Sequence, residues 1–75
     1  MNYKEQLRKI EDFFNKHEVP EVAGAINQTR TTHNLKRYVN LARIRIHDLS
    51  PSSSEYRRLL RNLRYIAKKV QDGEY

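Results

Sequence analysis

Residues 56–70, YRRLLRNLRYIAKKV, decide the fold class of this chain. Apolar residues recur here every three or four positions, which is the period of an α-helix with one buried face. The apolar positions are Tyr56, Leu59, Leu60, Leu63, Ile66, Ala67 and Val70. Among the remaining positions are six positive side chains and no negative ones. The stretch therefore predicts an amphipathic helix whose exposed side is strongly basic.

Signals for both ends of this helix lie in the flanking residues. Pro51 favours an extended conformation in the residue before it, so the helix should begin after this proline. Ser52 and Glu55 have the spacing of a capping box, in which side chains satisfy free N–H groups of the first turn. Gly73 suits the left-handed conformation that ends many helices. A helix over about residues 53–71 agrees with all of these signals.

The same periodicity occurs twice earlier in the chain. Over residues 3–17 the apolar face comprises Tyr3, Leu7, Ile10 and Phe14, with Phe13 beside them. Over residues 34–48 it comprises Leu35, Tyr38, Val39, Ala42 and Ile46. Leu41 and Ile44 fall outside the second stripe, so they indicate another contact surface, either for a helix of this chain or for a partner.

The segment between these two helices is harder to interpret. Pro20 suits the first turn of a helix, and apolar residues follow it, so we expect a short helix over residues 20–29. Residues 28–34, QTRTTHN, are all polar and include three threonines, which are poor helix formers. We expect a turn there, with Thr32 or Asn34 capping the next helix.

The chain is therefore predicted to be a single all-α domain over residues 1–75, a small bundle of three or four helices. Their expected ranges are about 3–17, 20–29, 34–48 and 53–71. A single helix over residues 20–48 is the alternative for the middle of the chain. Seventy-five residues bury a modest core, so a homodimer remains open.

Catalytic and metal-binding patterns are absent from the sequence. The chain has no cysteine, and its histidines, His17, His33 and His47, lack the spacing of metal ligands. Its two glycines stand alone, so the sequence has no glycine-rich phosphate loop. We predict a protein that is not an enzyme and holds no metal or cofactor. No apolar run is long enough to span a membrane, and we expect a cytoplasmic protein.

Positive charge is concentrated in the later part of the chain. The sequence has 15 Lys and Arg residues against 9 Asp and Glu, for a net charge of +6. From Arg30 to Lys69, eleven positive side chains face two negative ones, and eight of the eleven are arginine. Arginine presents a planar fork of donors to phosphate or carboxylate groups, whereas lysine would suffice for solubility. Such regional basicity is typical of a surface that binds an anionic partner.

One stripe of the last helix carries much of this charge. Its members lie three or four residues apart, and each such like-charge pair destabilises a helix by about 0.2–0.5 kcal/mol. We therefore predict a nucleic-acid-binding protein, DNA favoured over RNA, such as a small regulator. The candidate phosphate-binding residues are Arg57, Arg61, Arg64 and Lys68, with Lys36, Arg37 and Arg43 on the preceding helix. Antiparallel packing of the two helices could join their basic sides into one surface.

Contacts to bases have fewer candidates. Arg30 lies in the polar segment before a predicted helix, and Tyr65 lies on the basic side of the last helix, where it could stack on a base. Residues 20–39 fit a helix-turn-helix poorly, because the turn lacks its usual glycine. The alternative function is an interaction or inhibitor module that docks an acidic surface of a partner protein.

Overall fold

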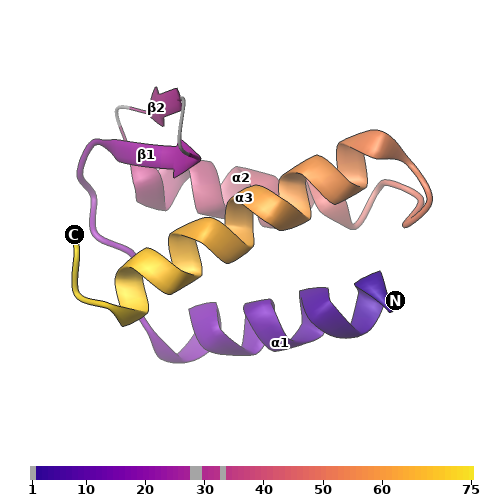
Figure 1. Cartoon of the computed structure of the whole chain (residues 1–75), viewed down its shortest axis with the longest axis horizontal. Coiled ribbons are helices and arrows are strands. Elements are labelled where there is room, and N and C mark those ends of the chain that lie inside the picture. The colour runs from indigo at the N-terminus through magenta and orange to yellow at the C-terminus, as the bar shows by residue number, and fades with distance from the viewer. Residues whose placement is uncertain (1, 28–29, 33) are drawn as a thin grey trace.

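The computed structural model describes residues 2–27, 30–32 and 34–75, with the backbone alone described for residues 30–32. This part of the chain forms α1 (Tyr3–Lys16), β1 (Gly24–Asn27), β2 (Arg30–Thr32), α2 (Leu35–Ile46) and α3 (Ser54–Gln71). In Figure 1, α3 crosses in front of α2 and above α1, and the two strands lie along one edge. The predicted helical bundle is confirmed, with three helices whose bounds are close to those expected.

The core forms around α3, as its apolar periodicity predicts. This helix packs against α1, α2 and β1. Each of its buried aliphatic side chains contributes roughly 1.5–3 kcal/mol relative to an exposed position. The buried apolar residues of the three helices are Leu7, Ile10, Phe14, Leu35, Val39, Ala42, Ile46, Tyr56, Leu59, Leu60, Leu63 and Ile66.

Among the residues whose burial the structure describes, one buried residue is polar, and a hydrogen bond satisfies it. The Asn62 side chain is 6% exposed, and its Nδ2 donates to Oη of Tyr38 over 2.9 Å. Tyr38 belongs to the apolar face of α2 and is half-buried. The bond links α2 to α3. It also gives the buried amide a partner, and without one the amide would destabilise the fold.

An asparagine side chain caps the start of α2, and a serine side chain caps the start of α3. The Oδ1 atom of Asn34 accepts from the N–H of Arg37 over 2.9 Å, so one of the two predicted caps of α2 is confirmed. For α3 the cap is Ser53, whose Oγ accepts from the N–H of Tyr56 over 3.1 Å. The capping box predicted for Ser52 and Glu55 is therefore wrong by one residue, because the helix begins one position later.

Gly73 ends α3 as predicted. Its φ is +71°, in the left-handed region that glycine occupies without steric penalty. Its N–H donates to the carbonyl of Val70 over 3.1 Å, and the N–H of Glu74 donates to that of Lys69 over 3.0 Å. These two bonds form a Schellman motif, which satisfies carbonyl groups left free in the last turn.

The helix predicted over residues 20–29 does not form. Its described part contains β1, which pairs antiparallel with β2, with Gly24 opposite Thr32 and an irregularity between Ala25 and Asn27. The alternative of one helix over residues 20–48 is excluded for the same reason. Two strands satisfy the segment better because threonine and isoleucine, with branched Cβ atoms, suit extended backbone. The turn predicted for residues 28–34 is wrong for residues 30–32, which form β2, and Gln28, Thr29 and His33 lie outside the described residues.

Glycine at position 24 allows β1 to approach the helices closely. A Cβ atom there would lie 2.7 Å from Cδ1 of Leu35 and 2.8 Å from Cε1 of Tyr75. The Tyr75 hydroxyl donates to the carbonyl of Ala25 over 2.8 Å, which fastens the end of the chain to this strand. The missing side chain thus lets β1 lie directly against Leu35 of the core.

Candidate nucleic-acid interface

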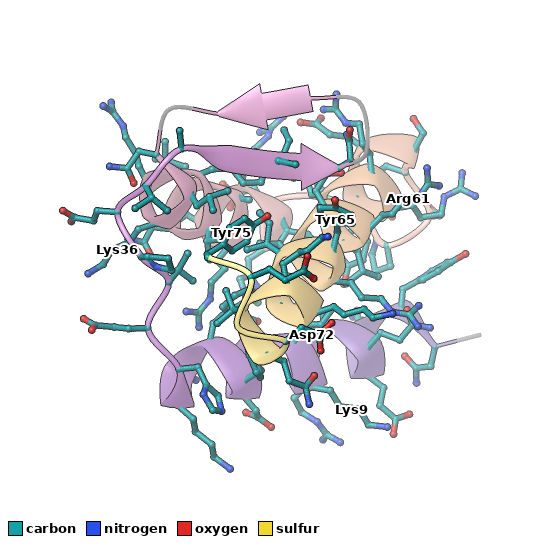
Figure 2. The ribbon with its side chains drawn as sticks, turned by 60° about the vertical axis from the view of Figure 1, so that its left-hand side comes forward. Lys9, Lys36, Arg61, Tyr65, Asp72 and Tyr75 are labelled. Atoms are coloured by element: carbon teal, nitrogen blue, oxygen red, sulfur yellow. The ribbon has the colours of Figure 1, made fainter. Side chains whose placement is uncertain are left out.

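The predicted basic stripe is exposed along α3. Arg57, Arg61, Arg64 and Lys68 all lie on its solvent side. At 100° per residue they fall within an arc of about 60°. Arg61 extends from α3 away from the core, as Figure 2 shows. The helix thus presents its positive charges in one direction, away from its leucines.

Three of these residues line a groove between α1 and α3. The groove has a volume of about 560 Å³. From α1 it is lined by Tyr3 and Gln6, which are uncharged. From α3 it is lined by Ser54, Arg57, Arg58, Leu60, Arg61 and Arg64. The lining therefore holds four guanidinium groups and no carboxylate.

These arginines keep their charge uncompensated. Among the residues that the structure describes, no carboxylate lies within ion-pair distance of Arg57, Arg61 or Arg64. Glu55, in the first turn of the same helix, instead accepts from the guanidinium of Arg45 on α2, with both N–O distances 3.3 Å. That hydrogen bond raises the pKa of Arg45. The like-charge repulsion expected from the sequence is thus present in the folded chain.

The C-terminal end of α3 differs from this stripe. Lys68 is exposed but does not line the groove. Lys69 pairs with Glu74 over 3.0 Å, and this hydrogen bond raises the pKa of Lys69. Its Nζ also lies 5.4 Å from the ring centroid of Tyr65, a cation–π contact. Tyr65 is half-buried with this lysine against its ring, so it is a poorer stacking platform than the sequence suggests.

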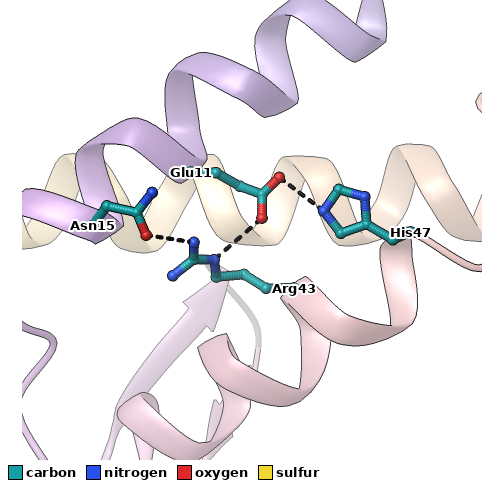
Figure 3. A network of polar contacts seen from close by, with 4 residues as sticks. All are labelled: Glu11, Asn15, Arg43 and His47. Atoms are coloured by element: carbon teal, nitrogen blue, oxygen red, sulfur yellow. Dashed lines mark hydrogen bonds and ion pairs between the residues drawn. The ribbon is translucent and has the colours of Figure 1, made fainter.

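On α2, Lys36, Arg43 and Arg45 each face an acidic partner, whereas Arg37 faces none among the described residues. Arg43 donates from Nε to Glu11 over 3.4 Å and from Nη2 to Oδ1 of Asn15 over 2.8 Å. The other carboxylate oxygen of Glu11 lies 2.9 Å from Nε2 of His47 (Figure 3). The side chains of Arg43 and Glu11 are 23% and 21% exposed, so this pair is well covered. The Arg43 charge is therefore neutralised by Glu11 in a contact that joins α1 to α2.

The remaining predicted residues are dispersed. Lys36 lies 3.5 Å from the exposed carboxylate of Glu18. Arg37 is exposed near the start of α2. Arg30 begins β2, and its side chain lies outside what the structure describes. The helix-turn-helix comparison fails for residues 20–27, because the described backbone there is not helical.

The two basic sides do not form one surface. Glu11, which holds Arg43, and Gln6, which lines the arginine groove, lie about 140° apart around α1. Lys36 and Arg61 likewise lie at opposite sides of the molecule in Figure 2. The sequence predicted Arg57, Arg61 and Arg64 as binding residues, but neither Arg58 nor the opposite wall of the groove, Tyr3 and Gln6. No local pattern signals that wall, because it depends on how α1 packs beside α3.

The described part of the chain has two further properties. It contains no helix that is both long enough and apolar enough to cross a membrane. Its histidines and carboxylates form no group of three or more that could hold a metal ion. Comparisons of the chain with family models, curated proteins and solved structures give no significant match.

Proposed function

We propose that this chain is a non-enzymatic nucleic-acid-binding protein whose interface is the groove between α1 and α3. One observation carries the proposal: four arginines line this groove, and those of the central stripe have no carboxylate partner among the described residues. Three carboxylates, those of Glu11, Glu18 and Glu55, pair instead with cations of α2. The positive charges of Arg57, Arg61 and Arg64 therefore remain available to an anionic ligand.

Phosphate is the group that such a groove suits best. A guanidinium donates two parallel hydrogen bonds to phosphate oxygens, and it loses little hydration in doing so. Arg57 and Arg64 are seven residues apart, so their Cα atoms lie about 10 Å apart along the helix axis. A line of this length follows a nucleic-acid backbone over several phosphates, since each DNA strand carries one charge per roughly 3.4 Å of axis.

The proposed mode is recognition of the backbone rather than of sequence. The groove offers cations, the Gln6 amide and the Tyr3 ring, and four guanidinium groups in one lining suit a row of phosphates. Duplex DNA is the favoured ligand because its charge density exceeds that of a single strand. Arg30 remains a candidate for base contacts.

Fluorescence anisotropy titrations against random duplex DNA, single-stranded DNA and RNA test this proposal. Log K for duplex DNA should fall linearly with log salt, by about 0.9 for each phosphate neutralised. Replacing Arg57, Arg61 and Arg64 together by glutamine should reduce that slope by roughly 2–3 and weaken all sequences equally. Duplex affinity that is unchanged in this variant would contradict the proposal.

A matched control separates the groove from net charge. Arg8, Lys9 and Lys16 are exposed on α1 and do not line the groove. Replacing all three by glutamine removes the same charge and should change the salt slope much less. A carboxylate-rich protein surface could use the same four guanidinium groups. Binding to a partner protein would be favoured if a pull-down complex persisted after nuclease treatment and was lost in the Arg61→Glu variant.

A further inference from the structure

The outward side of α2 carries an apolar patch that the fold leaves uncovered. Leu41 is 56% exposed and Ile44 is 68% exposed, the two highest values among the large hydrophobic residues described. They lie one helical turn apart, on the side away from Val39 and Ile46, which are buried. One exposed leucine needs no explanation, but two adjacent aliphatic side chains form a patch that association would remove from water.

Opposite charges lie at the two ends of this patch. Arg37 precedes it by one turn, and Asp48 follows it in the turn after α2, where its N–H donates to the carbonyl of Arg45 over 3.0 Å. At 100° per residue, Arg37, Leu41 and Ile44 of α2 fall within an arc of about 60°, and Asp48 follows Ile44 by four residues, just beyond the end of the helix at Ile46. Within the described part of the chain, neither the Arg37 guanidinium nor the Asp48 carboxylate forms a hydrogen bond or ion pair.

The four residues are spaced so that two antiparallel copies of the patch would match each other. Positions 41 and 44 share a midpoint between residues 42 and 43, and positions 37 and 48 share the same midpoint. A twofold axis through that point would lay two copies of α2 antiparallel. Leu41 would then face Ile44 of the second copy, and Arg37 would face Asp48 of the second copy. Each contact would occur twice, as an isologous interface requires.

We propose that this face of α2 binds a second copy of the chain in an antiparallel, twofold dimer. Nucleic acid is a poor occupant because Asp48 would repel it, and a uniformly acidic protein would match only the Arg37 end. The patch is small, so the dimer should be weak and in fast exchange. Since α1 and α3 line the arginine groove and no residue of α2 does, the dimer would leave both arginine grooves free. This proposal stands independently of nucleic-acid binding.

Charge reversal at the two ends provides a test specific to this register. Sedimentation equilibrium should be run from about 10 µM to about 1 mM, the range expected for a small interface. Arg37→Asp and Asp48→Arg should each raise the dissociation constant at least about tenfold, because each places like charges opposite one another twice. The double variant should recover dimerisation. An equal mixture of the two single variants should also dimerise, as a heterodimer.

Controls keep the test independent of folding and net charge. Lys9→Asp and Asp12→Arg make the same charge changes at exposed positions on α1, and they should leave the dissociation constant unchanged. Ile44→Ser should abolish the dimer, while circular dichroism of the diluted protein shows an unchanged monomer. A wild-type chain that stays monomeric at 1 mM would overturn the proposal. So would dimers that both single reversals leave intact, because the interface would then lie elsewhere or have another register.

Discussion

Glu11 on α1 accepts a hydrogen bond from Arg43 on α2 over 3.4 Å, although the two residues lie 32 positions apart in the sequence. This contact joins two helices whose backbones touch little, and it neutralises one of the cations that the sequence assigns to a binding surface. The same carboxylate also contacts His47. Where a cation finds such a partner, it serves the fold; where it finds none, as along α3, it is available to a ligand.

Replacing Glu11 by glutamine should lower the free energy of unfolding by about 1–2 kcal/mol, because Arg43 would lose its charged acceptor in a well-covered contact. Urea denaturation measures this change. Glu18→Gln is the matched control, since the Glu18 carboxylate is 89% exposed beside Lys36. Its effect should stay within about 0.5 kcal/mol, because exposed ion pairs contribute little. Equal losses in both variants would show that the Glu11 contact is not structural.

Arg61→Glu should stabilise the protein while it weakens nucleic-acid binding. The change removes repulsion with Arg57 and Arg64 and places opposite charges at the same spacing, with a gain of about 0.5–1 kcal/mol. Thermal melting and anisotropy on one sample test both halves. Stability gained together with binding lost is the pattern expected of a surface maintained for a ligand. A less stable variant would contradict the idea that the stripe is uncompensated.

Tyr38→Phe should destabilise the fold by about 1–2 kcal/mol, because the Asn62 amide would lose its acceptor inside the core. Denaturant unfolding gives the value. Adding Asn62→Leu to this variant should recover part of the loss, since both polar groups are then gone. A double variant less stable than Tyr38→Phe would indicate that leucine does not fit at position 62.

Ser53→Ala should cost about 1 kcal/mol, because it removes the acceptor for the N–H of Tyr56 at the start of α3. The neighbouring change Ser52→Ala is the control. Within the described part of the chain the Ser52 side chain bonds to Oγ of Ser50 alone, so its removal should have a much smaller effect. Helix content and urea midpoints measure the effects of the two substitutions. A larger loss of stability in Ser52→Ala than in Ser53→Ala would place the cap at Ser52.

Stability should decrease above pH 10. Burial raises the pKa of Tyr56 and of Tyr75 above the ordinary value of 10.0. The unfolded chain therefore releases these protons first, so the stabilisation is complete below pH 10 and is lost as the pH rises through the higher folded values. Tyr56→Phe should make the alkaline decline in the urea midpoint shallower, with a remaining slope from Tyr75. If Tyr56→Phe left this alkaline slope unchanged, the pKa of Tyr56 would be the same in the folded and unfolded chains.

The three helices could be predicted because their determinants are local. An apolar stripe such as Leu59, Leu63 and Ile66 repeats at helical spacing, and no other regular structure can bury it. Asn34 and Gly73 mark helix ends through contacts within one turn. Ser53 was missed by one position because three adjacent serines offer the same chemistry, and only the path of the chain after Pro51 selects among them.

The hairpin could not be predicted in the same way. Ala25 and Ile26 read as a helical face, but β1 gains its stability from β2, from α3 and from the hydroxyl of Tyr75, which is 50 residues from Ala25. Contacts over such a separation outweigh a weak local preference.

The sequence by itself determined which part of the chain is basic and which face of each helix is buried, since both follow from residue type and spacing. Tertiary structure decided which charges remain free. Arg43 and Arg61 are equivalent by local pattern, each an arginine on the polar side of an amphipathic helix. Packing sets Arg43 against Glu11 and sets Arg61 beside the neutral Gln6. Electrostatic compensation depends on distance in space, and that distance is not encoded in spacing along one helix.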